Sequence, residues 1–188
     1  IANRAGVLKY DGEARDFYKT PSAALSIAVD SSDVVYVGCI GEVGIIDYQD
    51  REFQYSSIHV SDTLNDLFLE TRHMLGKVYF MGSNNLIVYD IANKTVNHHK
   101  GSFMNIYELD NEMFINTSDE KTYLINDSLT VIKTDKRVSY SSVKRNMPDL
   151  LIGYDQAIYS YQNFEFTRLP QSTILQESGF EAKEIQWL

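Results

Sequence analysis

The sequence predicts an all-β fold and, within that class, a β-propeller. Three observations carry this prediction: short strand-like runs dominate the chain, they occur in groups of four, and the groups repeat at nearly constant intervals. Of the 188 residues, 44% are hydrophobic and 12% are aromatic, led by 13 Tyr, and these residue types favour strands. The composition is that of a globular chain and not of a disordered one.

The clearest group of four strands lies within residues 25–60. Its apolar runs, residues 25–29, 34–39, 43–48 and 53–58, are separated from one another by Asp, Ser, Arg and Gly residues. Short runs of β-branched and aromatic residues bounded by turn formers are typical of antiparallel strands joined by tight turns. The unit is therefore predicted to be a four-stranded antiparallel meander.

Two independent landmarks show that this unit repeats. The residue that follows the aromatic step of the second strand recurs at spacings of 44, 35 and 36 residues, and the landmark of the third strand recurs at spacings of 38, 41, 36 and 36 residues. The second-strand positions are Gly38, Gly82, Thr117 and Gly153, and the third-strand positions are Tyr10, Tyr48, Tyr89, Ile125 and Tyr161. A period near 40 residues with four strands per unit is typical of propeller blades.

The predicted blades follow from this period. Four complete blades are expected at residues 25–60, 65–99, 102–134 and 138–169, with partial blades at residues 1–19 and 183–188. The second and third strands of each unit are nearly continuous apolar runs, which must be covered on both faces. Neighbouring blades provide that cover in a propeller, so this chain is expected to be part of a larger one.

The register of the repeats leads to three further expectations. The opening partial blade should hold only a third and a fourth strand, at residues 6–11 and 14–19. The first strand of the second complete blade is placed at residues 66–70, although apolar residues between 64 and 75 also fit a helical stripe. The last strand, residues 183–188, should be the inner strand of a further blade. An isolated piece would then expose strand edges and either associate with itself, for example as a homodimer, or be held by a partner chain.

Composition and charge limit the partners of the chain. A net charge of −9 at pH 7 argues against nucleic acid, because a phosphate backbone requires a basic patch. No apolar run approaches about 18 residues, so contact with a membrane is expected only through segments that this sequence does not contain. The single cysteine, Cys39, has no internal partner for a disulfide and is interpreted as a small packed side chain.

The motifs that could carry chemistry are better explained by structure. Gly38, Gly41 and Gly44 resemble a phosphate-binding loop, but the Lys and Ser or Thr of such a loop are missing, so a hairpin is predicted. His98 and His99 are neighbours on a strand and point to opposite faces, so they do not easily share one metal ion. We therefore expect no metal, no cofactor and no enzymatic activity for this part of the protein.

The repeat unit resembles the two-component regulator propeller repeat. The residues that carry the resemblance are Ile27, Asp30, Tyr36, Val37, Gly38, Gly44, Ile45 and Tyr48. The resemblance implies the periplasmic sensor region of a bacterial hybrid two-component system histidine kinase, in which two seven-bladed propellers often precede a membrane helix and the kinase. It also implies signal transduction in response to a ligand that tends to be a glycan fragment. Any kinase activity would belong to other parts of such a protein.

Functional residues are expected in the loops of one propeller face, where connectors between blades meet the turns between second and third strands. An acidic domain that binds an anionic or hydroxyl-rich ligand needs local hydrogen-bond donors. The donors in these connectors are Lys100, Lys136 and Arg137, and Asp62 and Asn84 are their expected polar partners. The sequence thus predicts a ligand site formed by these five residues.

The functional prediction is a ligand-sensing extracytoplasmic propeller that binds a small molecule, such as a glycan fragment, or a protein partner. Two alternatives share the same fold. One is a protein-interaction scaffold of the WD-repeat kind, and the other is a propeller enzyme that cleaves glycans. Neither a Gly-x-Ser-x-Gly nucleophile motif nor a His-Glu-x-x-His zinc motif occurs in the sequence, which makes the enzyme the less favoured of the two.

Overall fold

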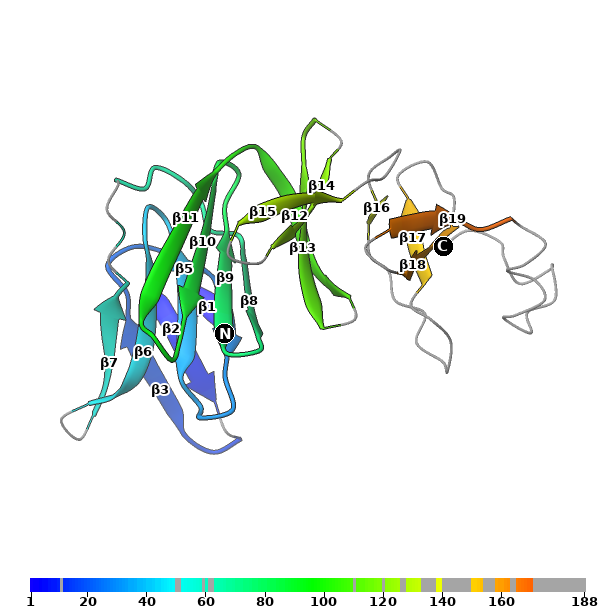
Figure 1. Ribbon diagram of the computed structural model, residues 1–188. Helices are drawn as coiled ribbons and strands as arrows, with labels where there is room; N and C mark the ends of the chain where they lie inside the picture. The colour runs from blue at the N-terminus through cyan, green and yellow to red at the C-terminus, as the bar shows by residue number, and fades with distance from the viewer. Residues whose placement is uncertain are drawn as a thin grey trace. The chain divides into compact units, whose positions relative to one another are not determined.

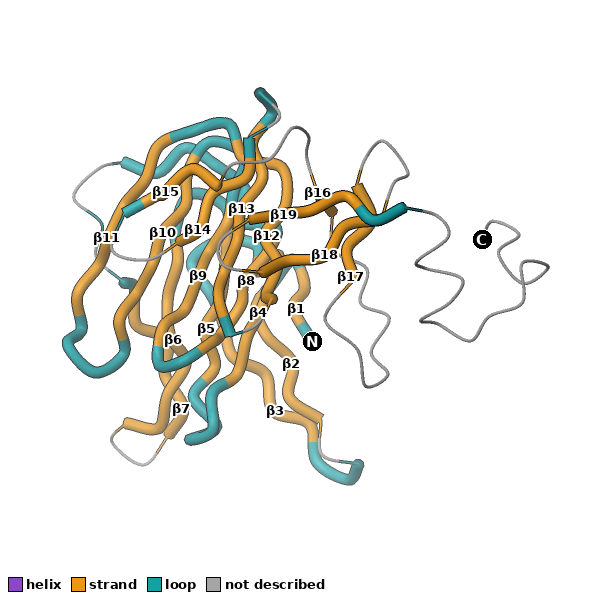
Figure 2. The backbone as a smooth tube through the Cα atoms, turned by 45° about the vertical axis from the view of Figure 1, so that its right-hand side comes forward, coloured by secondary structure: helices purple, strands orange, loops and turns teal. Residues whose placement is uncertain are grey.

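Every regular element among the described residues of the computed structural model is a β-strand (Figures 1 and 2). The described residues are 1–10, 12–49, 52–58, 60, 63–109, 111–119, 121–125, 128–132, 138–139, 150–153, 158–162 and 165–170. They form four four-stranded antiparallel sheets and one three-stranded sheet, which confirms the predicted all-β class. The chain divides into two compact units, Ile1–Ile106 and Tyr107–Leu188, which are described separately.

The first sheet has one strand more than expected. It contains β1 (Ala2–Asn3), β2 (Gly6–Tyr10) and β3 (Arg15–Lys19) in the order β1-β2-β3. The expectation of only two strands here was wrong, because β1 pairs antiparallel with β2 through Ala2↔Val7 and Asn3↔Gly6. A strand of two residues is too short to produce an alternating pattern in the sequence.

The second sheet has the strands predicted for residues 25–60. Its order is β4 (Ala24–Val29), β5 (Val35–Cys39), β6 (Val43–Gln49) and β7 (Glu52–Ser57). The turn between β4 and β5 is held by Asp30, whose Oδ1 accepts hydrogen bonds from the backbone N–H groups of Ser32 at 2.8 Å and Val34 at 3.1 Å. The glycine motif of residues 38–44 is the β5–β6 hairpin, as predicted.

The third sheet contains a misplaced strand. Its order is β8 (Glu70–Met74), β9 (Lys77–Met81), β10 (Asn85–Asp90) and β11 (Thr95–Lys100). The prediction of a first strand at residues 66–70 was wrong, because β8 starts only at Glu70, where the predicted strand was expected to end. The preceding residues form a connector, in which Leu67 makes an isolated bridge with Ile40. Phe68 belongs to this connector, and its side chain is completely buried. Its burial explains why the connector has an apolar residue that resembles part of a strand in the sequence.

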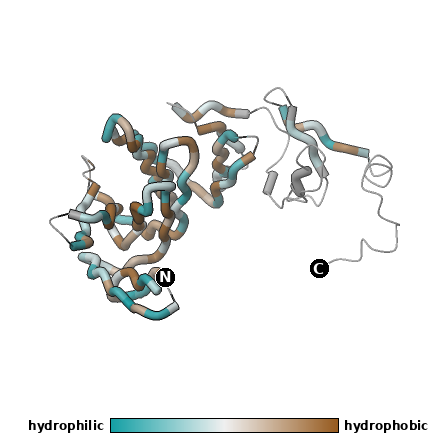
Figure 3. Tube along the Cα trace, turned by 90° about the horizontal axis from the view of Figure 1, so that it is seen from below, coloured by the Kyte–Doolittle hydropathy of each residue, from teal (hydrophilic) through white to brown (hydrophobic). Residues whose placement is uncertain are grey.

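The three sheets of the first unit are stacked in sequence, as blades are. The first strand of each sheet lies beside that of the next, β1 beside β4 and β4 beside β8, and β3 lies beside β7 at the outer side. Brown, hydrophobic stretches recur through the part of the chain near the N-terminus in Figure 3. One apolar cluster, which includes Val7, Val37 and Ile46, lies between the first and second sheets. A larger cluster, which includes Tyr36 and Phe80, lies between the second and third.

The second unit contains two four-stranded sheets. They are β12 (Phe103–Leu109), which begins in the first unit, with β13 (Glu112–Thr117), β14 (Thr122–Ile125) and β15 (Leu129–Ile132), and then β16 (Val138–Ser139), β17 (Leu150–Gly153), β18 (Ile158–Gln162) and β19 (Glu165–Arg168). Aromatic side chains join the two sheets. The Phe114 ring lies 5.2 Å from that of Tyr161 and 5.9 Å from that of Phe166, centroid to centroid.

The strand expected within residues 183–188 lies outside the described residues. Among the residues that are described, no helix is long and apolar enough to span a bilayer.

Candidate functional site

The loops at one end of the first unit are tied together by backbone hydrogen bonds. We call this end the connector face; it comprises residues 20–24, 40–42, 63–69, 83–85 and 100–102. The N–H of Gly41 donates to the carbonyl of Asp66 at 2.9 Å, and the N–H of Gly101 donates to that of Asn84 at 3.0 Å. Each hairpin turn is thus fixed to the connector that leads into the following sheet. The connectors and turns meet on one face, as the sequence predicted.

Asp66 is the most heavily hydrogen-bonded side chain of this face. Its carboxylate accepts five hydrogen bonds, from the backbone N–H groups of Leu67, Ser83, Asn84 and Asn85 and from the Asn85 side-chain amide, at 2.7–3.1 Å. Burial alone would raise the pKa of this carboxyl, but the hydrogen bonds outweigh burial and hold its pKa below the ordinary value. Asp66 therefore stays ionised and fixes the β9–β10 turn.

The repeated glycine of the second strand is explained by this face. A Cβ atom on Gly82 would collide with the Asp66 carboxylate, and one on Gly38 would lie 2.8 Å from the carbonyl oxygen of Phe68. In both sheets the connector crosses directly over the end of the second strand, where only a glycine leaves room. The repeated glycine is thus required by the packing of the connector, and it is no sign of a phosphate-binding loop.

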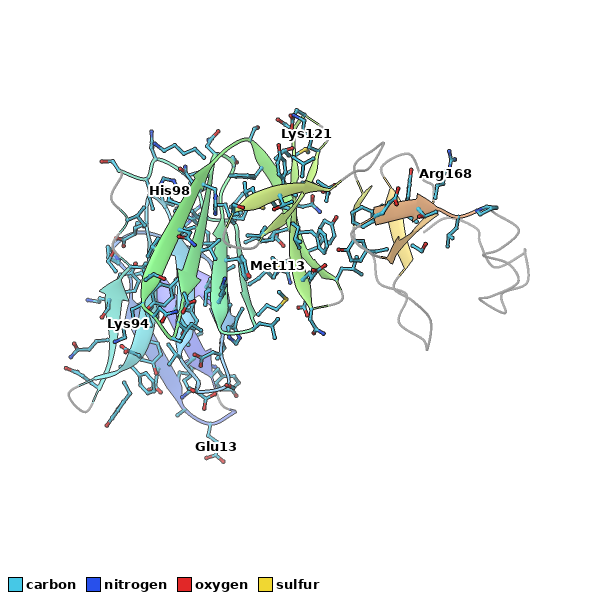
Figure 4. The ribbon with its side chains drawn as sticks, viewed as in Figure 1. Glu13, Lys94, His98, Met113, Lys121 and Arg168 are labelled. Atoms are coloured by element: carbon cyan, nitrogen blue, oxygen red, sulfur yellow. The ribbon has the colours of Figure 1, made fainter. Side chains whose placement is uncertain are left out.

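The structure brings together two of the five predicted site residues. Asn84 is exposed in the β9–β10 turn, and Lys100 is the exposed last residue of β11, paired in register with Asn85. His98 lies on the same strand, and its Nε2 is 2.8 Å from Asn85 Oδ1. Figure 4 shows His98 towards the connector end of β11 and Lys94 at the opposite end. Asp62, Lys136 and Arg137 lie outside the described residues.

A second polar group occupies the same face beside the β5–β6 hairpin. The carboxylate of Glu42 accepts hydrogen bonds from the hydroxyls of Tyr55 at 3.0 Å and Ser57 at 3.4 Å. Cys39, the last residue of β5, is fully buried. Burial, together with the nearby charge of Glu42, raises the pKa of its thiol to about 11. The thiol is therefore protonated at neutral pH, which agrees with its interpretation as a packed side chain.

Three exposed apolar side chains on the connector face were missed by the sequence analysis. Ile40, Leu67 and Leu69 expose 46%, 45% and 57% of their surface, and Ile40 and Leu67 are bridge partners. The sequence analysis placed the two leucines in the strand expected at residues 66–70, because the repeat register demanded a strand there. Together with Asn84 and Lys100, they give the face both apolar and polar contact groups.

A groove of about 490 Å³ lies at the outer side of the first two sheets. It is lined by Phe17, Tyr18, Lys19, Thr20, Pro21, Phe53, Gln54 and Tyr55. The ring centroids of Tyr18 and Phe53 are 5.3 Å apart. Lys9 Nζ lies 5.2 Å from the centroid of the Phe53 ring. No motif in the sequence indicated this groove, because its walls come from the fourth strands of two different units.

The polar groups of both regions are amides, hydroxyls, carboxylates and ammonium groups. Within the described residues, no cluster of three or more His, Cys, Asp or Glu side chains is arranged to hold a metal ion.

Comparison with known proteins supports the fold. No protein-family model matches the chain, and no curated protein matches it. Among solved structures, it is similar to the extracellular domain of the putative one component system BT4673 from B. thetaiotaomicron, at 10% identity and a TM-score of 0.54, over 89% of this chain and 25% of that chain. A second structure of that domain, described as part of a putative hybrid two component system, gives a TM-score of 0.52 over the same shares at 10% identity.

A further similar structure is the computationally designed Ika4 protein, at 12% identity and a TM-score of 0.50, over 76% of this chain and 92% of that chain. The chain spans only about a quarter of the BT4673 domain. At such identities the likeness concerns the fold alone. Together with the stacked four-stranded sheets, it identifies the fold as that of a β-propeller.

Proposed function

We propose that this chain is a ligand-sensing propeller region of an extracytoplasmic, periplasmic sensor of the two-component type. The observation that carries the proposal is the connector face, whose turns are held by Asp66 and by backbone hydrogen bonds while Asn84 and Lys100 remain exposed. A surface that is rigid before binding loses little conformational entropy on binding. Fixed donors at the end of a sheet stack suit a hydroxyl-rich or anionic small molecule.

Two further observations support this assignment. The resemblance of the repeat to two-component regulator propellers agrees with the structural similarity to the BT4673 extracellular domain. The ligand class suggested by the resemblance is a glycan fragment, whose hydroxyls pair with amide and ammonium groups. In this proposal the propeller reports ligand binding to a kinase or regulator located elsewhere, and it has no catalytic activity of its own.

A second candidate function is a protein-interaction scaffold. The specific observation in its favour is the exposed apolar set of Ile40, Leu67 and Leu69 on the same face. A protein partner would bury these side chains, each contributing about 1.5–3 kcal/mol if fully removed from water. A glycan ligand would instead depend mainly on Asn84 and Lys100, so the two functions predict different sensitive residues.

The test is calorimetry of the chain with a panel of neutral and acidic oligosaccharides. The double variant Asn84→Ala with Lys100→Asn should lose binding, whereas Lys94→Asn, at the opposite end of the same hairpin, should retain it. Asparagine suits the positive φ of 53° at Lys94, so this control removes a charge without adding strain. Paired alanines at Lys136 and Arg137 test the rest of the predicted set. Loss of binding in the control, or unchanged affinity in both site variants, would refute the proposed site.

A further inference from the structure

The last strand of the first sheet, β3, has an open edge on the side away from β2 (Figure 1). The N–H of Leu8 in β2 donates to the carbonyl of Ile1 at 2.8 Å, so the backbone groups of Leu8 are turned towards β1. Phe17 is paired in register with Leu8, and backbone groups alternate in direction along antiparallel strands, so the N–H and C=O of Phe17 point away from β2. The backbone groups of Arg15 and Lys19, two positions to either side, point the same way.

The side chains beside this open edge carry positive charge. Arg15, Phe17 and Lys19 alternate along β3 and therefore lie on one face of the sheet. Both basic side chains are exposed, and Phe17 between them is 45% exposed. Asp16, the acidic residue of β3, lies on the other face, where it accepts a hydrogen bond from the Tyr18 hydroxyl at 3.5 Å. A chain with a net charge of −9 thus has a positively charged strand edge with an aromatic ring at its centre.

The repeat does not require this charge. Within the bounds of the other outermost strands, β7 and β15 contain no Lys or Arg, and β11 and β19 contain one each, as their last residue. The register positions equivalent to Arg15 are Phe53 in β7 and Val96 in β11, because each pairs with the repeated tyrosine of the third strand. The first sheet therefore has a charge where the next two sheets have an apolar side chain.

The open edge also borders a concave surface. Phe17, Tyr18 and Lys19 belong to the wall of the groove of about 490 Å³, and Lys19 is the only charged residue among the eight that line it. Lys9 adds a second ammonium group over the Phe53 ring. An extended segment laid along β3 would therefore meet open backbone groups, aromatic surface and positive charge together.

The charges decide which kind of strand can pair with β3. Charged side chains on an edge strand commonly prevent unwanted pairing, and charges of a single sign also discriminate between partners. A second copy paired antiparallel through β3 about Phe17 would place Arg15 opposite Lys19, and like charges directly opposite each other destabilise a sheet. A strand with carboxylates at those two positions would instead form two favourable cross-strand pairs.

We propose that the open edge of β3 binds an acidic, extended segment of a partner protein, which adds to the first sheet as a further strand antiparallel to β3. An apolar residue of the segment lies opposite Phe17, and acidic residues two positions before and after it lie opposite Lys19 and Arg15. The backbone of the segment supplies affinity, and the pattern acidic-x-apolar-x-acidic supplies specificity. This site is separate from the connector face and does not depend on the ligand proposed there.

The test is an NMR titration of the whole chain with the synthetic peptide acetyl-Glu-Val-Leu-Thr-Glu-amide. In the antiparallel pairing its two glutamates lie opposite Lys19 and Arg15 and its leucine opposite Phe17. The backbone amide signals of residues 15–19 should shift, and the Phe17 amide should exchange more slowly with solvent. The same peptide with lysine in place of both glutamates should bind about tenfold more weakly or not at all.

A double variant tests the two basic residues. Arg15→Gln with Lys19→Gln should weaken binding of the glutamate peptide by about tenfold. Arg168→Gln with Lys94→Asn is the matched control, because it removes the same charge from other sheets, and affinity should remain unchanged (Figure 4). Thermal unfolding of both double variants establishes that they are folded.

Two N-methylated peptides separate strand addition from simple charge attraction. In the proposed pairing the N–H of the peptide leucine faces β3, and the N–H of its threonine faces solvent. Methylation of the leucine nitrogen should therefore abolish binding, whereas methylation of the threonine nitrogen should preserve it.

Any one of four results would overturn the proposal. They are equal affinity for the glutamate and lysine peptides, equal effects of the two N-methyl groups, unchanged affinity in the variant of Arg15 and Lys19, and peptide-induced shifts that lie outside the first sheet. Concentration-dependent shifts at β3 in the chain alone, together with a dimer in light scattering, would assign the edge to a second copy and would overturn it as well.

Discussion

The carboxylate of Asp66 accepts hydrogen bonds from both amides of Asn85, from the backbone N–H at 2.9 Å and from the side-chain Nδ2 at 3.0 Å. The two residues belong to different parts of the blade, because Asp66 lies in the incoming connector and Asn85 opens β10. Asn85 Oδ1 in turn contacts His98 Nε2 at 2.8 Å. One buried carboxylate thereby organises the turn that presents Asn84 and the strand end that presents Lys100.

Removing the charge of Asp66 should destabilise the first unit. Asp66→Asn retains the shape of the side chain but replaces one acceptor oxygen by a donor facing N–H groups, so we expect a loss of about 2–3 kcal/mol in the free energy of unfolding. Urea denaturation measures this change. The control is Asp90→Asn at the opposite end of the sheet, where the Asp90 carboxylate accepts a hydrogen bond from the backbone N–H of Asn93 in an exposed turn, and the loss in this variant should be clearly smaller. Equal losses in the two variants would contradict the role given to Asp66.

The low pKa of Asp66 predicts a specific pH dependence. A carboxyl whose pKa is lower in the folded than in the unfolded state stabilises the fold above its unfolded pKa, and this stabilisation disappears as the pH falls through the folded pKa. Stability should therefore fall as the pH decreases below the ordinary carboxyl value of 3.8. Asp66→Asn should lose this part of the acid sensitivity. Parallel urea curves of the parent and the variant between about pH 6 and pH 3 measure the difference, and identical slopes would refute it.

Much of the fold could be predicted because the apolar runs must be covered on both faces and the turns between them carry Gly, Asp and Ser. Those constraints are local and recur in each unit, so most of the described strands could be predicted with nearly correct bounds. The two errors arise where a local signal is weak or misleading. β1 has only two residues, and Phe68 is buried by packing over Gly38 and not by membership of a strand.

The candidate site was less accessible to sequence reasoning. Asn84 and Lys100 were expected in the site because they are polar residues in the turns and connectors between predicted strands, and the structure places the start of β10 next to the end of β11. Asp66 was not found, since the residues that bond to its carboxylate are mostly 17–19 positions later and only the fold brings them to it. The groove lined by Tyr18 and Phe53 depends on two different sheets lying side by side, which the sequence of a single repeat does not encode.

Gly82 should tolerate no side chain, because its Cβ would occupy the position of the Asp66 carboxylate. We expect Gly82→Ala to reduce the free energy of unfolding by about 1–3 kcal/mol, the usual range for overpacking a tight site. The cost should shrink in the background of Asp66→Ala, because that change removes the colliding atoms, and the two changes should then be non-additive. Ser83→Ala, one residue later and exposed, is the control. Strict additivity in the double variant would refute the collision.

The β8–β9 hairpin offers a stabilising change. Its two-residue turn, Leu75 and Gly76, has φ values of 48° and 75°, which define a turn that favours Asn-Gly. Leu75 is 72% exposed, so its side chain contributes little packing while its Cβ is strained by the positive φ. Leu75→Asn should therefore raise the free energy of unfolding by about 0.5–1 kcal/mol, measured by urea denaturation. Leu75→Ala, which retains the strained Cβ and shortens the side chain, should give no such gain, and an equal gain in both variants would show that exposure of leucine, and not backbone strain, limits the stability of this turn.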